Sequence, residues 1–137
     1  MSGIRNKNTR IEVAVSRVLF ARKYRYRLND KTLPGKPDMV FPKYRAVVFV
    51  NGCFWHMHDC HLFKWPSSNQ DFWRKKINGN VERDIKNTQL LLNLGCRVAI
   101  IWECSMRGKA SPGINSVADR VEQWLTNSNI PQLEVKA

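Results

Sequence analysis

Apolar residues recur at helical spacing in the first part of the chain. Thr9, followed three residues later by Glu12, has the form of a capping box, in which two side chains satisfy backbone N–H groups at a helix start. The helix predicted from this box runs to about Tyr24. Its apolar face consists of Ile11, Val15, Val18 and Leu19.

Two short strands are predicted after a loop rich in Asn, Pro and Gly. Residues 38–41 and 44–50 carry β-branched or aromatic side chains, and Pro42 and Lys43 form a tight connection between them. Residues 51–69 are dense in Cys, His and aromatic residues and show no regular period. We interpret this segment as an irregular excursion held by a metal ion.

Helical spacing returns near Asp71 and is interrupted by the Asn-Gly-Asn run at residues 78–80. The pattern therefore predicts two helices, of which the second extends from Val81 to Leu94. Gly95 supplies the stop, because glycine adopts the left-handed conformation that commonly ends a helix.

The last third of the chain predicts a buried strand at residues 97–102 and a helix that begins near Ser116. Residues 127–137 show little periodicity and are expected to be loosely held. The resulting order, αββααβα, favours an α/β fold in which helices flank a mixed central sheet. The length predicts a single domain over residues 1–137.

Charge indicates the class of partner. The chain has 23 Lys and Arg against 11 Asp and Glu, which leaves a formal charge of +12 and an isoelectric point near 10. Such a balance is typical of proteins that bind nucleic acid, although a basic surface can also serve solubility alone. Nothing resembles a signal peptide or a membrane span, so we expect a cytoplasmic protein that associates with DNA and with no membrane.

The cysteines favour metal binding over disulfides in that reducing setting. Three ligands can converge from one loop while the fourth arrives at the end of a strand, which predicts a closed tetrahedral zinc site. The set is Cys53, His58, Cys60 and Cys104. Its C-x4-H-x-C spacing is unlike the paired C-x2-C of common zinc fingers, so core cysteines beside surface histidines stay an alternative. His56 and His61 are left without a structural task.

Asp38 follows Pro37 at the start of a predicted strand. A Pro-Asp pair in this position recurs in magnesium-dependent nucleases, where the carboxylate holds the metal ion. The pair alone is a weak signal. The usual companion, an acid-x-Lys triplet on the next strand, is missing, because that strand ends in Phe49, Val50 and Asn51.

Several segments together resemble one family, the very-short-patch repair (Vsr) DNA mismatch endonucleases. The resemblance covers nearly the whole chain and rests on RNKNTRIE, LPGKPD, VFVNGCFWHMHDCH, the Phe-Trp pair before Arg74, NVERD and WECSMRG. It implies a restriction-endonuclease-like, PD-(D/E)xK-related fold with a structural zinc and a catalytic magnesium. The implied reaction is a nick in one strand, 5′ to the thymine of a T:G mismatch in double-stranded DNA.

The resemblance also implies residue roles. Cys53, His58, Cys60 and Cys104 match the zinc ligands, and Asp38 with the backbone carbonyl of Val50 matches the magnesium ligands. His56 matches the general base, supported by Glu12 and Asp84, although Glu12 can equally serve the capping box alone. As a partner beyond DNA, the resemblance suggests a functional link to a cytosine-5 DNA methyltransferase. The protein is expected to be a monomer.

Two features depart from the family pattern. Asn51 stands where a relative carries His, so a contact to the phosphate is expected to be weaker but retained through a hydrogen bond. The N-terminus is short, and Met1 and Ile4 align with residues that wedge into the minor groove.

Aromatic and basic residues predict the DNA contacts. Phe54, Trp55 and Trp73 can wedge between base pairs at a weakly stacked mismatch, although ordinary core packing is the alternative. Trp102 and Trp124 are interpreted as core. Candidate phosphate contacts are Lys64, Arg74, Lys75, Lys76, Lys86 and Arg107. Two rival functions stay open: a non-catalytic zinc module that binds DNA, and a nuclease that cuts both strands of matched DNA.

Overall fold

The computed structural model describes residues 9–54, 56, 58, 60, 63–106, 111–127 and 129–136. Its helices are α1 (Thr9–Ala21), α2 (Gln70–Asn93) and α3 (Ile114–Thr126), with 3-10 turns η1 (Pro42–Tyr44) and η2 (Glu103–Ser105). Its strands are β1 (Arg27–Leu28), β2 (Met39–Phe41), β3 (Ala46–Asn51), β4 (Arg97–Trp102) and β5 (Gln132–Val135).

The strands form one mixed sheet in the order β1-β2-β3-β4-β5. The pairs β1–β2 and β2–β3 are antiparallel, whereas β3–β4 and β4–β5 are parallel. In the parallel register, Asn51 lies opposite Trp102, so β3 and β4 end at the same edge of the sheet. The predicted mixed sheet is confirmed, and this shared edge positions the chemistry described below.

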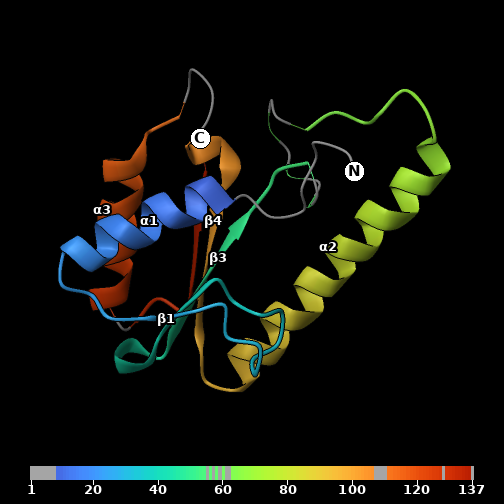
Figure 1. Ribbon diagram of the computed structural model, residues 1–137. Coiled ribbons are helices and arrows are strands. Elements are labelled where there is room, and N and C mark those ends of the chain that lie inside the picture. Colours follow the sequence, from blue (N-terminus) through green and yellow to red (C-terminus); the bar gives the residue numbers. More distant parts are fainter. Residues whose placement is uncertain are drawn as a thin grey trace.

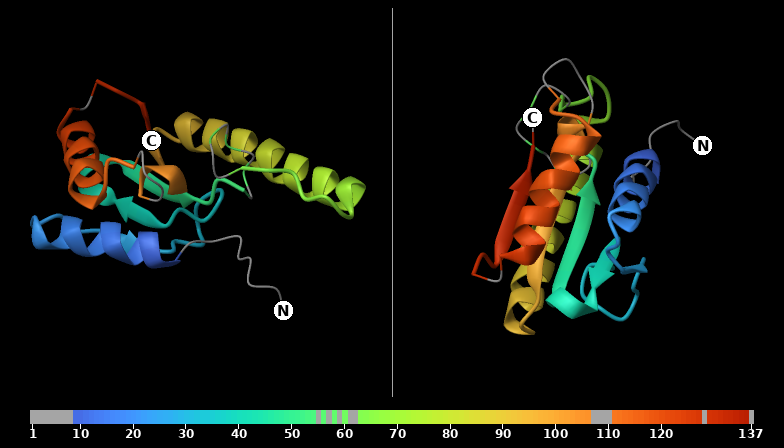
Figure 2. Two further views of the ribbon diagram at one scale, coloured as in Figure 1. Left: turned by 90° about the horizontal axis from the view of Figure 1, so that it is seen from above. Right: turned by 90° about the vertical axis from the view of Figure 1, so that its left-hand side faces the viewer.

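Helices cover both faces of the sheet, with α1 and α3 on one side and α2 on the other (Figures 1 and 2). The alternation of β3 divides its side chains between the two layers: Val48 packs toward α1 and α3, while Val47 packs against Leu91 of α2. Burial on both faces explains why the sequences of β3 and β4 are almost continuously apolar.

Polar contacts join the segment after α1 to α3. Arg22 donates to Asp119 at 2.8 Å and to Glu122 at 3.0 Å, and the Tyr24 hydroxyl donates to Glu122 at 2.9 Å. Burial, and then the hydrogen bond to Glu122, raises the pKa of Tyr24 to about 12. Among the described residues, no helix is both long and apolar enough to cross a membrane.

The predicted break at residues 78–80 is wrong, because α2 runs without interruption for 24 residues. A glycine inside a helix costs only about 1 kcal/mol relative to alanine, which one turn of packing can offset. Ile77, directly before the expected break, is fully buried and holds that turn. The first turns of α2 project beyond the sheet (Figures 1 and 2).

The C-terminal tail also differs from the prediction, because Gln132–Val135 forms the edge strand β5. Arg97 anchors the segment that precedes β5. Its guanidinium donates to the carbonyls of Leu125 at 3.2 Å and Ile130 at 3.1 Å, and also to that of Trp124. Strand β1 was likewise not predicted, since two residues carry no period.

Candidate metal centre and active site

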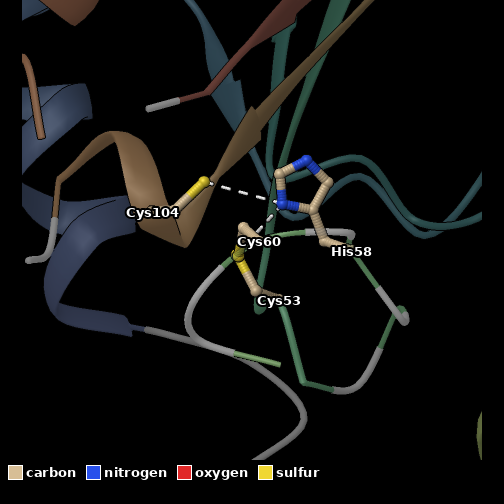
Figure 3. A group of neighbouring side chains, drawn as sticks. All are labelled: Cys53, His58, Cys60 and Cys104. Atoms are coloured by element: carbon tan, nitrogen blue, oxygen red, sulfur yellow. Dashed lines mark hydrogen bonds between the residues drawn. The ribbon is translucent and has the colours of Figure 1, made fainter. Parts of the chain in front are cut away.

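Four predicted ligands gather where β3 and β4 end (Figure 3). Cys53 follows β3 by two residues, and Cys104 lies in η2 directly after β4, so the parallel pairing of the strands brings both thiols to one edge. The loop after β3 places His58 and Cys60 next to these two thiols. Its turn is closed by the N–H of His58, which donates to the Cys53 carbonyl at 2.9 Å.

The geometry of this cluster fits a bound metal ion. All ligand atoms lie within 4.8 Å of one another, and His58 Nδ1 is 3.5 Å from Cys53 Sγ and 3.6 Å from Cys104 Sγ. One imidazole nitrogen has a single lone pair, so it cannot accept hydrogen bonds from both thiols. With Zn–N of about 2.0 Å and Zn–S of about 2.3 Å, a nitrogen and a sulfur of one zinc tetrahedron lie about 3.5 Å apart.

The surroundings of the cluster hold its ligands and disfavour uncompensated charge. Burial raises the pKa of the Cys53 thiol, so a thiolate there needs a cation beside it. The His58 ring stacks on Trp102 with centroids 4.1 Å apart, which fixes the plane of the imidazole. Glu103 Oε1 accepts from the Cys53 backbone N–H at 3.2 Å. These four side chains could therefore hold a metal ion in a closed, structural site.

A pocket of about 280 Å³ lies beside the metal centre and contains the predicted acid. Asp38 is buried directly before β2, and its Oδ2 accepts from the Val50 backbone N–H at 2.6 Å. The carboxylate thus lies against the backbone of residue 50. Asn51 and His56 line the same pocket.

His56 and Asp84 form a pair at the pocket wall, with His56 Nδ1 against Asp84 Oδ2. An ionised carboxylate can only accept, so Nδ1 carries the proton of this contact and the lone pair is left on Nε2. Asp84 comes from α2 and His56 from the loop after β3, 28 residues apart in sequence. The pair therefore has the polarity that a general base needs.

The structure does not unite all the predicted site residues. It brings Asp38, Val50, Asn51, His56 and Asp84 together in the pocket. Glu12 is buried in the first turn of α1 and is not among the residues that line this pocket. Trp55, Met1 and Ile4 lie outside the described residues.

Lining residues that sequence reasoning missed include Lys36, Asn87 and Thr88. Two signals could have found them. Lys36 stands two residues before Asp38, and Asn87 and Thr88 follow Asp84 at the three- and four-residue spacing that shares a helix face.

Aromatic side chains form a contact chain next to the metal loop. The predicted Phe54 and Trp73 rings meet edge to face with centroids 5.5 Å apart. The chain continues through Phe63, 6.2 Å from Phe54, and Trp65, 5.1 Å from Phe63, neither of which was predicted. The high proportion of aromatic residues in the metal loop was the sequence feature that could have identified these two residues. Trp102 is buried as expected, yet it also contacts His58 and thus belongs to the metal centre.

Comparison with known proteins gives consistent matches. The family described as “DNA mismatch endonuclease Vsr” matches residues 1–62 of the chain. The DNA mismatch endonuclease Vsr of Escherichia coli is 42% identical over 125 residues, which cover 91% of this chain and 80% of that protein.

Two further relatives are named as nicking enzymes. The type II nicking enzyme V.NmeAIP of Neisseria meningitidis is 49% identical over 110 residues, covering 80% of this chain and 79% of its own length. The type II nicking enzyme V.XorIIP of Xanthomonas oryzae is 47% identical over 106 residues, covering 77% and 78%. The chain is therefore similar in sequence to DNA endonucleases over most of its length.

Proposed function

Since this chain belongs to the Vsr family of DNA mismatch endonucleases, we propose that it nicks one DNA strand 5′ to the thymine of a T:G mismatch. The reaction is magnesium-dependent hydrolysis, which starts very-short-patch repair. The observation that carries the proposal is the meeting of Asp38 and the His56–Asp84 pair in one pocket beside the Cys/His cluster.

The pocket suits hydrolysis of a phosphodiester. His56 Nε2 takes a proton from water as its oxygen attacks phosphorus, while Asp84 holds Nδ1–H and stabilises the imidazolium. The P–O3′ bond breaks, the O3′ oxygen takes a proton from water, and the products are a 3′-hydroxyl and a 5′-phosphate. Asp38 and the carbonyl of Val50 would hold magnesium, which neutralises charge on the phosphate and the leaving oxygen. Asn51 donates a hydrogen bond to the phosphate.

Recognition of the mismatch is assigned to the aromatic contact chain. Phe54 and Trp73 are in edge-to-face contact, and Phe72 is exposed next to Trp73. A mismatched pair costs less to unstack than a matched one, which favours insertion of flat side chains at that step. Trp55, Met1 and Ile4 are proposed to add to this insertion.

The fold, the identity of the metal ion and the partner are also proposed on the basis of membership of the Vsr family. We propose a restriction-endonuclease-like fold, since Asp38 directly precedes β2 and accepts from the backbone N–H of Val50 near the end of β3. The ion in the Cys/His cluster is proposed to be zinc, because three sulfurs and one nitrogen suit it. We also propose that the protein is a monomer and that it is functionally linked to a cytosine-5 DNA methyltransferase.

The test is strand-specific cleavage of labelled duplexes that differ only at one base pair. With magnesium present, we expect a nick in the thymine-containing strand of the T:G duplex, an intact partner strand and an intact T:A duplex. Varying the flanking sequence then defines the site. Equal cutting of both strands of the matched duplex would instead identify a restriction-type nuclease, and binding without any cleavage would identify a DNA-binding module.

A further inference from the structure

The candidate active-site pocket continues into a second, open cavity along α2. This cavity has a volume of about 490 Å³ and adds Asn80 and Arg83 to the lining. Both cavities share Lys36, His56 and Asp84, so Lys36 stands where the two meet. A DNA strand that enters along α2 would therefore pass Lys36 as it reaches His56.

The loop that carries Lys36 is pressed against the sheet and α2. Gly35 has a φ of +79°, and a Cβ at this position would lie 3.1 Å from the Phe49 ring and 3.2 Å from Cβ of Asn87. Only glycine gives this close approach without displacing its neighbours. The Lys36 N–H donates to the Leu33 carbonyl at 3.1 Å and closes the turn. The backbone of Lys36 is thus held at the rim of the pocket.

The charges of the residues that line the pocket indicate a role for Lys36. The described residues that line the inner pocket include two acids, Asp38 and Asp84, and Lys36 is their one Lys or Arg. Its side chain is exposed, and no ion pair within the described part of the chain engages it. A phosphate that gains charge in the transition state is stabilised by a cation fixed beside it. Strand β3 offers none, since it ends in Phe49, Val50 and Asn51.

We propose that Lys36 binds a non-bridging oxygen of the phosphate at the cut and stabilises the charge that develops there. The Lys36 ammonium group thereby replaces the lysine that the end of β3 lacks. This assignment rests on the proposed function, because it needs a phosphodiester in the pocket. A lysine acts on phosphate as a point charge, so the position of its charge matters more than the shape of its side chain.

The experiment compares three variants of the full chain, loaded with zinc and assayed with magnesium on the T:G duplex. Lys36→Gln removes the charge, Lys36→Arg keeps it, and Lys43→Gln removes a charge from exposed η1, at the opposite end of β3. We measure the single-turnover nicking rate at saturating enzyme and, separately, the dissociation constant for DNA. Thermal melting verifies that each variant is folded.

We expect Lys36→Gln to lower the nicking rate by about 100-fold, as loss of one group that stabilises transition-state charge does. Its dissociation constant should rise by less than about tenfold, because one phosphate contact among several is lost. Lys36→Arg should retain most of the rate, and Lys43→Gln all of it.

Two results would overturn the role of Lys36 alone: a Lys36→Gln rate equal to that of Lys43→Gln, or an equal loss in Lys36→Arg and Lys36→Gln while the wild-type chain nicks the T:G duplex. If the wild-type chain leaves that duplex intact, the proposed function fails, and this assignment fails with it.

Discussion

At the scale of single residues, the contact between His56 and Asp84 decides which imidazole nitrogen can accept a proton. The carboxylate holds Nδ1–H, so Nε2 keeps its lone pair, and His56 lines a pocket that also contains Asp38. The geometry resembles a base and its orienting acid, in which the acid stabilises the cation formed by proton transfer.

Replacing Asp84 by Asn should remove this control. An amide can donate to Nδ1, which moves the ring proton to Nε2 and leaves this nitrogen, the proposed base, without a lone pair. We expect the single-turnover nicking rate of Asp84→Asn to fall by about 100-fold or more, with DNA affinity almost unchanged. Glu82→Asn on the exposed side of α2 serves as the control. A normal rate for Asp84→Asn would mean that the contact does not orient the base.

Sequence reasoning identified these residues only through their motifs. Neither the spacing of His56 nor that of Asp84 predicts their contact, because it depends on how α2 crosses the end of the sheet. Lys36 was overlooked for a related reason: a lysine in a Pro-rich loop is unremarkable until Gly35 is seen to hold that loop against Phe49.

At the scale of elements, the metal loop depends on the parallel pairing of β3 and β4. That pairing places Cys53 and Cys104 at one edge, and the irregular segment between Cys53 and α2 is tied to the sheet by His58 and Cys60. The same loop carries Phe54 and His56. A metal ion here would thus brace the side chains proposed to recognise the mismatch and to act as the general base.

Cys104→Ser should lose the metal and much of the stability. A serine hydroxyl is a poor zinc ligand, and binding energy in such sites is folding energy. Elemental analysis should find no zinc in this variant, and its thermal midpoint should fall. Cys96→Ser, outside the cluster, should keep a full complement of zinc. Full zinc occupancy in Cys104→Ser would refute the four-ligand site.

The helices and strands were predictable where the apolar residues recurred over a long stretch and capping or turn residues marked the ends. Helix α1 and strands β2, β3 and β4 emerged from apolar spacing, whereas Asn78–Asn80 suggested a break that the packing of Ile77 prevents. Strand β5 has only four residues and takes its place from pairing with β4 and from the anchor at Arg97, which no local pattern encodes.

At the scale of the whole molecule, a group of basic side chains lies next to the aromatic contact chain. Arg74, Lys75 and Lys76 are exposed in the first turns of α2, which project beyond the sheet, and Arg74 lies 4.6 Å above the Trp65 ring. The projecting helix therefore offers phosphate contacts next to the rings proposed to enter the mismatch. Composition predicted a DNA partner, and these three residues are candidates for its phosphate contacts.

The central claim is that this pocket hydrolyses a phosphodiester with the help of Asp38. The most direct measurement is single-turnover nicking of the T:G duplex, with magnesium, by the wild-type chain, by Asp38→Asn and by Glu134→Gln, whose glutamate is an exposed residue of β5. We expect Asp38→Asn to lose at least about 100-fold in rate and Glu134→Gln to match the wild type. Cleavage by Asp38→Asn at the wild-type rate would contradict the account.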